Sequence, residues 1–330
     1  MPHHHLNTSR RHWLTGLAVL AASGPLSVLA QSDYPQKPIK IIVGYPPGGS
    51  VDMAARVLAD VLSARLPATV VVENLSGAAG TVAAQKVVSS PADGYTLLAG
   101  SSNEMAATGQ VNPAQKYDPL HDLTTIGMLA TAPVMLVAGP KTGVKSLAEF
   151  VDRVRKNPGR YSYGSSGVGS TLHFAGELVK QKAGLFMTHI PYRGTAPLTN
   201  DLLGGAIEFA MMSPTAAAPF VQSGRLIGLG ITSAQRFPGF PEIPALAEHP
   251  GLKGYEMAGW FAMAAPKGLP PAIAQRLRTA LQEGLKDPAI RKRLQDGGST
   301  PSTGQEDAAA VMRQDIARYA ALVKFANVTP

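Results

Sequence analysis

Several loops of this chain combine glycine with serine, threonine or asparagine directly after a short apolar run. Lys40–Val43 reads as a buried strand and precedes the loop Tyr45–Ser50, and the later loops Gly100–Asn103, Gly164–Thr171 and Tyr192–Thr195 follow the same pattern. Such loops present backbone N–H groups near the start of a helix, where the helix dipole also favours negative charge. The chemistry that they favour is the binding of a small anion.

These loops supply the predicted ligand-binding residues. Gly48 and Gly49 would let the backbone approach a ligand, Ser50 is expected to cap the following helix, and Arg193 is the one strong cation among the loops. Each of these residues also has a purely structural interpretation, as a turn glycine, a cap or a solvated side chain. The predicted set is Tyr45, Pro47, Gly48, Gly49, Ser50, Ser101, Ser102, Asn103, Ser165, Ser166, Gly169, Ser170, Thr171, His173, Arg193, Gly194 and Ser213.

The residue patterns of common enzymes are missing from the sequence. It contains no P-loop, no G-x-G-x-x-G, no G-x-S-x-G elbow and no H-E-x-x-H zinc motif. The chain has no cysteine, which excludes disulfides, thiolate metal sites and a cysteine nucleophile. We therefore expect no catalytic residues, no metal site and no cofactor.

The elements that must position the loops alternate between strands and helices. Lys40–Val43, Thr69–Val72 and Tyr95–Ala99 are predicted strands with amphipathic helices between them, and the alternation restarts after Gly139. The order β-α-β-α-β indicates a parallel sheet covered by helices. The sequence thus predicts an α/β fold with two units and a helical C-terminal tail.

The N-terminus resembles an export signal. Arg10 and Arg11 precede an apolar stretch from Trp13 to Leu29, and small residues lead to a cleavage position after Ala30. Residues 1–30 are therefore interpreted as a Sec or Tat signal peptide, which predicts a periplasmic protein. Without the two signal arginines, the 30 basic and 22 acidic residues leave 28 − 22 = +6. The sequence contains no lysine- and arginine-rich run of the kind that binds nucleic acid.

An ordered set of motifs resembles the substrate-binding proteins of tripartite tricarboxylate transporters, the TctC or Bug family. The resemblance covers residues 34–327. The motifs are Tyr34–Val43, Pro46–Gly49, Val71–Asn74, Gly77–Gly80, Asp93–Leu97, Tyr117–Pro119, Asn157–Gly159, Tyr163–Gly167, His189–Gly194, Asp201–Gly205, Ser223–Arg225 and Trp260–Phe261.

The resemblance implies a two-lobed periplasmic-binding-protein fold of type II, the Venus flytrap, in which the chain crosses twice between lobes. It places lobe 1 at residues 31–136 plus 260–330 and lobe 2 at 137–259. It also implies a monomeric receptor for a small carboxylate or related anion, with membrane transporter subunits as partners. Arg193 stands where the family often has lysine, which leaves the identity of the ligand open. A periplasmic sensor and a secreted α/β enzyme are the alternative functions.

Overall fold

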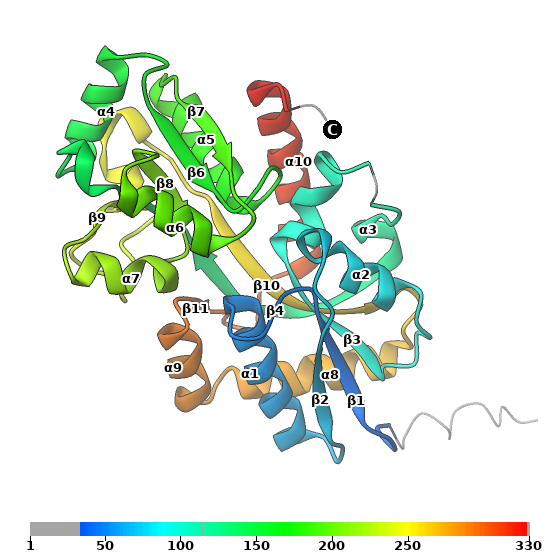
Figure 1. Cartoon of the computed structure of the whole chain (residues 1–330). Helices are drawn as coiled ribbons and strands as arrows, with labels where there is room; N and C mark the ends of the chain where they lie inside the picture. The colour runs from blue at the N-terminus through cyan, green and yellow to red at the C-terminus, as the bar shows by residue number, and fades with distance from the viewer. Residues whose placement is uncertain (1–33, 114, 329–330) are drawn as a thin grey trace, which may run out of the picture. The chain divides into compact units, whose positions relative to one another are not determined.

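The alternating strands and helices build two separate β-sheets (Figure 1). The computed structural model describes residues 34–113 and 115–328, and its elements lie in one unit of the chain that begins at Pro35. The first sheet has the order β11-β4-β10-β3-β1-β2 and the second β7-β6-β8-β5-β9. The strands are β1 (Ile39–Val43), β2 (Val70–Asn74), β3 (Thr96–Ser101), β4 (Leu123–Pro133), β5 (Met135–Ala138), β6 (Ser162–Ser165), β7 (Thr188–Pro191), β8 (Phe209–Met212), β9 (Ile227–Ile231), β10 (Ala258–Pro266) and β11 (Thr300–Pro301).

The helices pack on both faces of each sheet. In the first sheet, α1 contacts β1, β2 and β3, while α2 and α10 contact strands from the opposite side. In the second sheet, α5 packs on β6 and β8, while α6 and α7 belong to a separate apolar cluster. The helices are α1 (Ser50–Arg65), α2 (Thr81–Val88), α3 (Pro119–Asp122), α4 (Leu147–Lys156), α5 (Thr171–Ala183), α6 (Thr195–Gly204), α7 (Pro214–Gln222), α8 (Pro271–Gly284), α9 (Pro288–Asp296) and α10 (Ala308–Ala326).

The parallel part of the first sheet agrees with the predicted β-α-β-α-β order. Strand β1 pairs in parallel with β2 and β3, and four of its five side chains are buried because helices cover both faces. The long strands β10 and β4 then extend this sheet in antiparallel fashion. The sequence reasoning predicted only the parallel strands.

The chain passes between the sheets where two strands nearly join. β4 ends at Pro133 in the first sheet and β5 begins at Met135 in the second, with Val134 between them. The N–H of Val134 donates to Thr232 Oγ1 at 2.6 Å, and the N–H of Met257 donates to the carbonyl of Thr232 at 3.0 Å. The outgoing and returning segments are therefore tied to each other just before β10 re-enters the first sheet.

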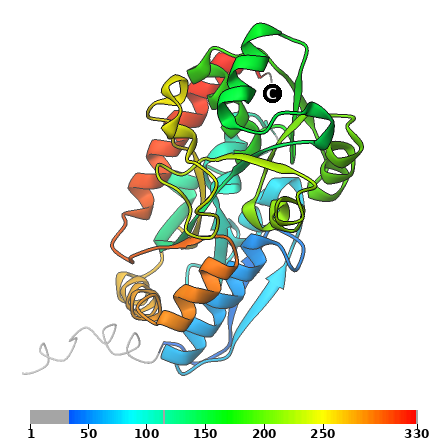
Figure 2. The same cartoon turned by 90° about the vertical axis from the view of Figure 1, so that its left-hand side faces the viewer.

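The C-terminal helix α10 contacts elements attached to both sheets. It packs against α5 of the second sheet and against the π-helical turn η3 (Asn103–Ala107), which follows β3 of the first (Figure 2). Among the described residues, no helix has the length and apolar character that crossing a membrane requires.

Candidate functional site

The first candidate loop, Pro46–Gly49, leads into α1 and is exposed to solvent. Gly48 has φ = +87°, a conformation that favours glycine. The prediction that Ser50 caps the helix is wrong: Gly49 is the N-cap residue and Ser50 is the first helical residue. No side chain caps this helix, and the carboxylate of Asp52 in its first turn instead accepts the N–H of Gly48 at 2.9 Å, one residue before the N-cap position.

The carboxylate of Asp52 accepts hydrogen bonds from several groups near the start of α1. Its side chain is almost fully buried and also accepts hydrogen bonds from Arg56 Nε and Asn74 Nδ2 at 2.9 and 2.8 Å. Burial acts to raise the pKa of Asp52, but the hydrogen bonds from Arg56, Gly48 and Asn74 outweigh it and lower this pKa. The N–H of Gly49 makes no hydrogen bond within residues 34–113 and 115–328. Donors at the start of α1 therefore remain available to a ligand.

The second candidate group gathers around a buried carboxylate, Glu104. Its Oε2 accepts hydrogen bonds from the hydroxyls of Tyr45 (2.8 Å) and Ser101 (2.5 Å), and its Oε1 accepts the N–H of Ser101 at 2.6 Å. The side-chain amide of Asn103 donates to Tyr45 Oη at 3.1 Å. The structure thus brings three predicted residues together, with Ser101 inside β3 rather than in a loop.

Glu104 is the residue of this group that the sequence reasoning missed. It is 0% exposed, and burial raises the pKa of Glu104 to about 6 despite its hydrogen bonds. The neighbouring loop Gly77–Gly80 is shaped around it, because a Cβ at Gly80 would lie 2.6 Å from Glu104 Oε2. In the same loop, Ala78 and Ala79 adopt positive φ values of 45° and 53°, which cost conformational energy in residues other than glycine.

Asn103 connects the first sheet's loops to the start of α5. Its Oδ1 accepts both the N–H and the hydroxyl of Thr171, each at 3.0 Å. The hydroxyl of Ser102 also lies 3.0 Å from Thr171 Oγ1, and Tyr319 of α10 lies 3.4 Å from it. Two candidate loops from different sheets therefore meet here, and the donors of Thr171 are already used by Asn103.

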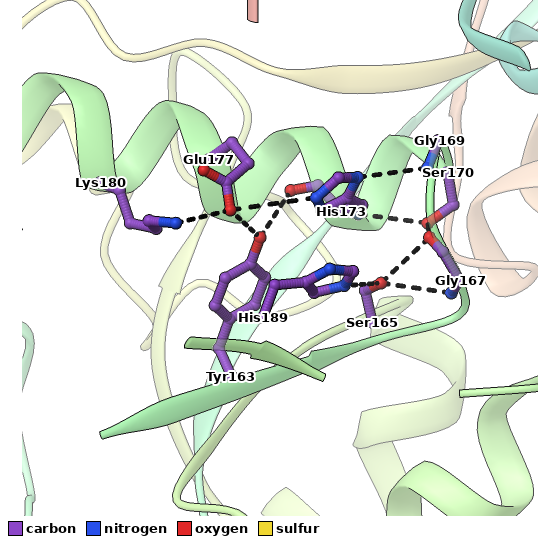
Figure 3. Close-up of polar contacts among 9 residues, drawn as sticks. All are labelled: Tyr163, Ser165, Gly167, Gly169, Ser170, His173, Glu177, Lys180 and His189. Carbon is purple, nitrogen blue, oxygen red and sulfur yellow. Dashed lines mark hydrogen bonds and ion pairs between the residues drawn. The ribbon is translucent and has the colours of Figure 1, made fainter. Parts of the chain in front are cut away.

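The third candidate loop precedes α5 and is fixed by an internal polar network (Figure 3). Ser170 is the N-cap residue: its hydroxyl accepts the N–H of His173 at 3.2 Å and donates to the carbonyl of Gly167 at 2.8 Å. Within the described residues, the N–H groups of Ser166 and Val168 make no hydrogen bond. These two donors suit an anion.

Two histidines, His173 and His189, stack on each other below this loop. His173 Nδ1 accepts the N–H of Gly169 at 3.2 Å, and His189 Nε2 lies 2.7 Å from Ser165 Oγ. The rings of His173 and His189 are 4.0 Å apart. Burial lowers the pKa of His173 to about 4 and that of His189 to about 3, so both rings are neutral at pH 7.

The remaining predicted residues lie apart from these groups. Arg193 is exposed between β7 and α6, and makes no side-chain hydrogen bond or ion pair within the described part of the chain. Gly194 is the N-cap residue of α6 with φ = +102°, and Ser213 is the N-cap residue of α7. No hydrogen bond joins them to Asn103 or Thr171 in the part of the chain that the structure describes.

Two pockets of about 290 and 270 Å³ lie elsewhere and contain no predicted residue. In the first, Arg278 and Gln282 already donate to the carbonyls of Ile126 and Gly304. The loops are the stronger candidates because they contain the predicted residues and keep unpaired backbone N–H groups at Gly49, Ser166 and Val168 within the described residues. Over residues 34–113 and 115–328, no cluster of histidine, aspartate or glutamate could hold a metal ion.

Comparison with known proteins identifies the family. The model of the family described as tripartite tricarboxylate transporter family receptor matches residues 54–328. The chain belongs to this family. Protein BugT of Bordetella pertussis is 34% identical to this receptor, over 97% of this chain and 98% of BugT.

Two solved structures resemble the receptor in fold and were determined with carboxylates. The R. palustris protein Rpa4515 with adipate has a TM-score of 0.80 and 33% identity, covering 90% of this chain and 100% of that one. MatC of Rhodopseudomonas palustris with bound malate has a TM-score of 0.76 and 27% identity, covering 88% and 100%. The two sheets therefore form a two-lobed solute-binding fold, as the sequence predicted.

Proposed function

We propose that this receptor captures a small carboxylate between its two lobes, by binding without catalysis. The observation that carries the proposal is the set of unpaired backbone donors at Gly49, Ser166 and Val168, from two loops that precede helices of different sheets. Hydrogen bonds between Asn103 and Thr171 link the two sheets at the same end of α5. Adipate and malate in the similar structures support the carboxylate as the ligand class.

The proposal extends to the protein's setting. We propose lobes close to the predicted ranges, residues 31–136 plus 260–330 and residues 137–259, with the boundaries moved so that Met135 and Leu136 of β5 join lobe 2, and Ala258 and Gly259 of β10 join lobe 1. The monomer would deliver its ligand to membrane subunits of a tripartite transporter. The signal peptide with cleavage after Ala30 lies outside the described residues, and it supports a periplasmic location. Mass spectrometry of the periplasmic protein should find Gln31 at the N-terminus.

Two substitutions test whether backbone donors hold the anion. Gly49→Val should weaken adipate or malate binding more than about tenfold, because a side chain there covers the loop's N–H groups. The fold should tolerate it, since Gly49 has φ = −79° and its Cβ would meet only Pro46 O, at 3.8 Å. Arg193→Ala should weaken binding by less than about tenfold.

Calorimetry with the matched control Gly204→Val, at an open position on α6, completes the test. The reverse order, with Arg193→Ala unable to bind and Gly49→Val unchanged, would replace the backbone site with an arginine clamp.

A further inference from the structure

His173 lies 3% exposed beneath the loop Ser166–Gly169 and faces it with a ring nitrogen. Nδ1 is 3.2 Å from the N–H of Gly169, and an N–H donor requires an unprotonated acceptor. The other nitrogen, Nε2, points toward Glu177 Oε1 at 3.9 Å. The neutral ring therefore carries its proton on Nε2, and the contact with Gly169 fixes that tautomer.

The groups packed around the ring keep it in place and uncharged. Burial lowers the pKa of His173 and outweighs Glu177, which acts to raise it. Lys180 also lowers this pKa, and its ammonium donates to Glu177 Oε1 at 2.8 Å beside the Tyr163 hydroxyl at 2.7 Å. His189 stacks on the ring at 4.0 Å, and a second imidazolium there would be repelled. On the other side, Phe174 packs against Tyr319 of α10.

The loop above has little freedom at Gly169. This residue has φ = +77°, and a Cβ there would lie 2.2 Å from Val111 Cγ2, a side chain that follows η3 in the first sheet's part of the chain. The hydrogen bond to His173 fixes the peptide plane between Val168 and Gly169, at the end of the segment that carries the N–H groups of Ser166 and Val168. With Gly169 held by His173, the N–H groups of Ser166 and Val168 remain unpaired.

We propose that His173 is a positioning residue, whose neutral Nδ1 holds Gly169 so that the N–H groups of Ser166 and Val168 face the ligand. The inference rests on the proposed function, and it assigns a role to a buried side chain that need not touch the anion. His189 and Ser165 also help to position this loop. Ser165 Oγ lies 2.7 Å from His189 Nε2 and accepts the N–H of Gly167 at 3.2 Å.

Two amide variants separate positioning from packing. The side-chain amide of His173→Asn can place an acceptor where Nδ1 lies, whereas the longer His173→Gln carries its amide toward Nε2 and Glu177. Both remove the ring and its stacking on His189, so both should lower the melting temperature by similar amounts. We expect His173→Asn to bind adipate or malate within about threefold of the unmodified protein, and His173→Gln to bind at least tenfold more weakly.

Hydrogen exchange of the Gly169 amide gives a readout that needs no ligand. Protection should be retained in His173→Asn and lost in His173→Gln, and ¹⁵N spectra of the unmodified protein should show an unprotonated Nδ1 on His173. Equal affinity and equal Gly169 protection in the two variants would overturn the proposal and leave His173 as a packing residue. If the unmodified protein binds neither carboxylate, the proposed ligand class fails, while the exchange data still decide the role of His173.

Discussion

Replacing Glu104 by glutamine should change how stability depends on pH. Burial raises the pKa of Glu104 from 4.5 to about 6, so the folded protein holds this proton more tightly than the unfolded chain does. The stability that the neutral carboxyl contributes is complete below pH 4.5 and is lost as pH rises through 6. A shift of about 1.5 units corresponds to about 2 kcal/mol, at 1.36 kcal/mol per unit.

Glutamine fits the same contacts without a charge. Its carbonyl oxygen can accept the N–H of Ser101 while its amide donates to the hydroxyls of Ser101 and Tyr45, which can accept as well as donate. We therefore expect the fold to survive. The difference in unfolding free energy, Glu104→Gln minus the unmodified protein, should be about 2 kcal/mol larger at pH 7.5 than at pH 4.5.

Urea unfolding at both pH values measures this difference, and other titrating groups cancel because each comparison is made at one pH. Glu73→Gln, at an exposed position of β2, matches the change of charge and serves as the control. The reasoning is refuted if Glu104→Gln shifts stability equally at pH 4.5 and pH 7.5, because the carboxyl then ionises without cost.

Three further predictions concern the same loops. Asn103→Leu and Thr171→Val should show a coupling of about 1–2 kcal/mol in a double-mutant cycle by urea unfolding, and zero coupling would contradict the bridge between them. Burial lowers the pKa of His173 to about 4, so the stability that the neutral ring contributes to the fold is complete above pH 6.5 and is lost as pH falls through 4. When the free energy of unfolding is measured against pH, His173→Asn should lack this acid loss of about 3 kcal/mol. Ala79→Gly, at φ = +53°, should raise stability by about 0.5–1 kcal/mol in thermal or urea unfolding, and a decrease would show that the loop is not strained.

Local sequence patterns predicted the parallel strands and the helices between them, because apolar spacing and helix-capping residues each act over a few neighbouring residues. Helix α5 runs from Thr171 to Ala183 because Ser170 caps its start and Gly184 in the left-handed conformation ends it, and both residues are recognisable in the sequence. The antiparallel strands β10 and β4 were not predicted, because their pairing joins segments more than a hundred residues apart and leaves no local signal. The cap of α1 was assigned to Ser50 because a hydroxyl is a common cap, but the helix begins one residue earlier, with Gly49 at the N-cap position and no side-chain cap.

The candidate site was predicted in part for the same reason. Glycine and serine at strand ends signal a loop, and this placed Tyr45, Ser101, Asn103 and Thr171 in the set that the structure brings together. Glu104 carried no such signal: a single carboxylate in an apolar segment becomes informative only when its buried position is known.

The arrangement of charges explains why an anion can bind where few cations are present. Asp52 and Glu104 are both negative groups close to the candidate donors, yet each already accepts at least three hydrogen bonds. A carboxylate whose lone pairs are engaged does not compete for further donors, and the charge of Asp52 is also balanced by Arg56. The donors left over are backbone N–H groups, which carry no net charge and are fixed by the fold. The proposed site would therefore hold an anion through directed hydrogen bonds rather than through a strong field.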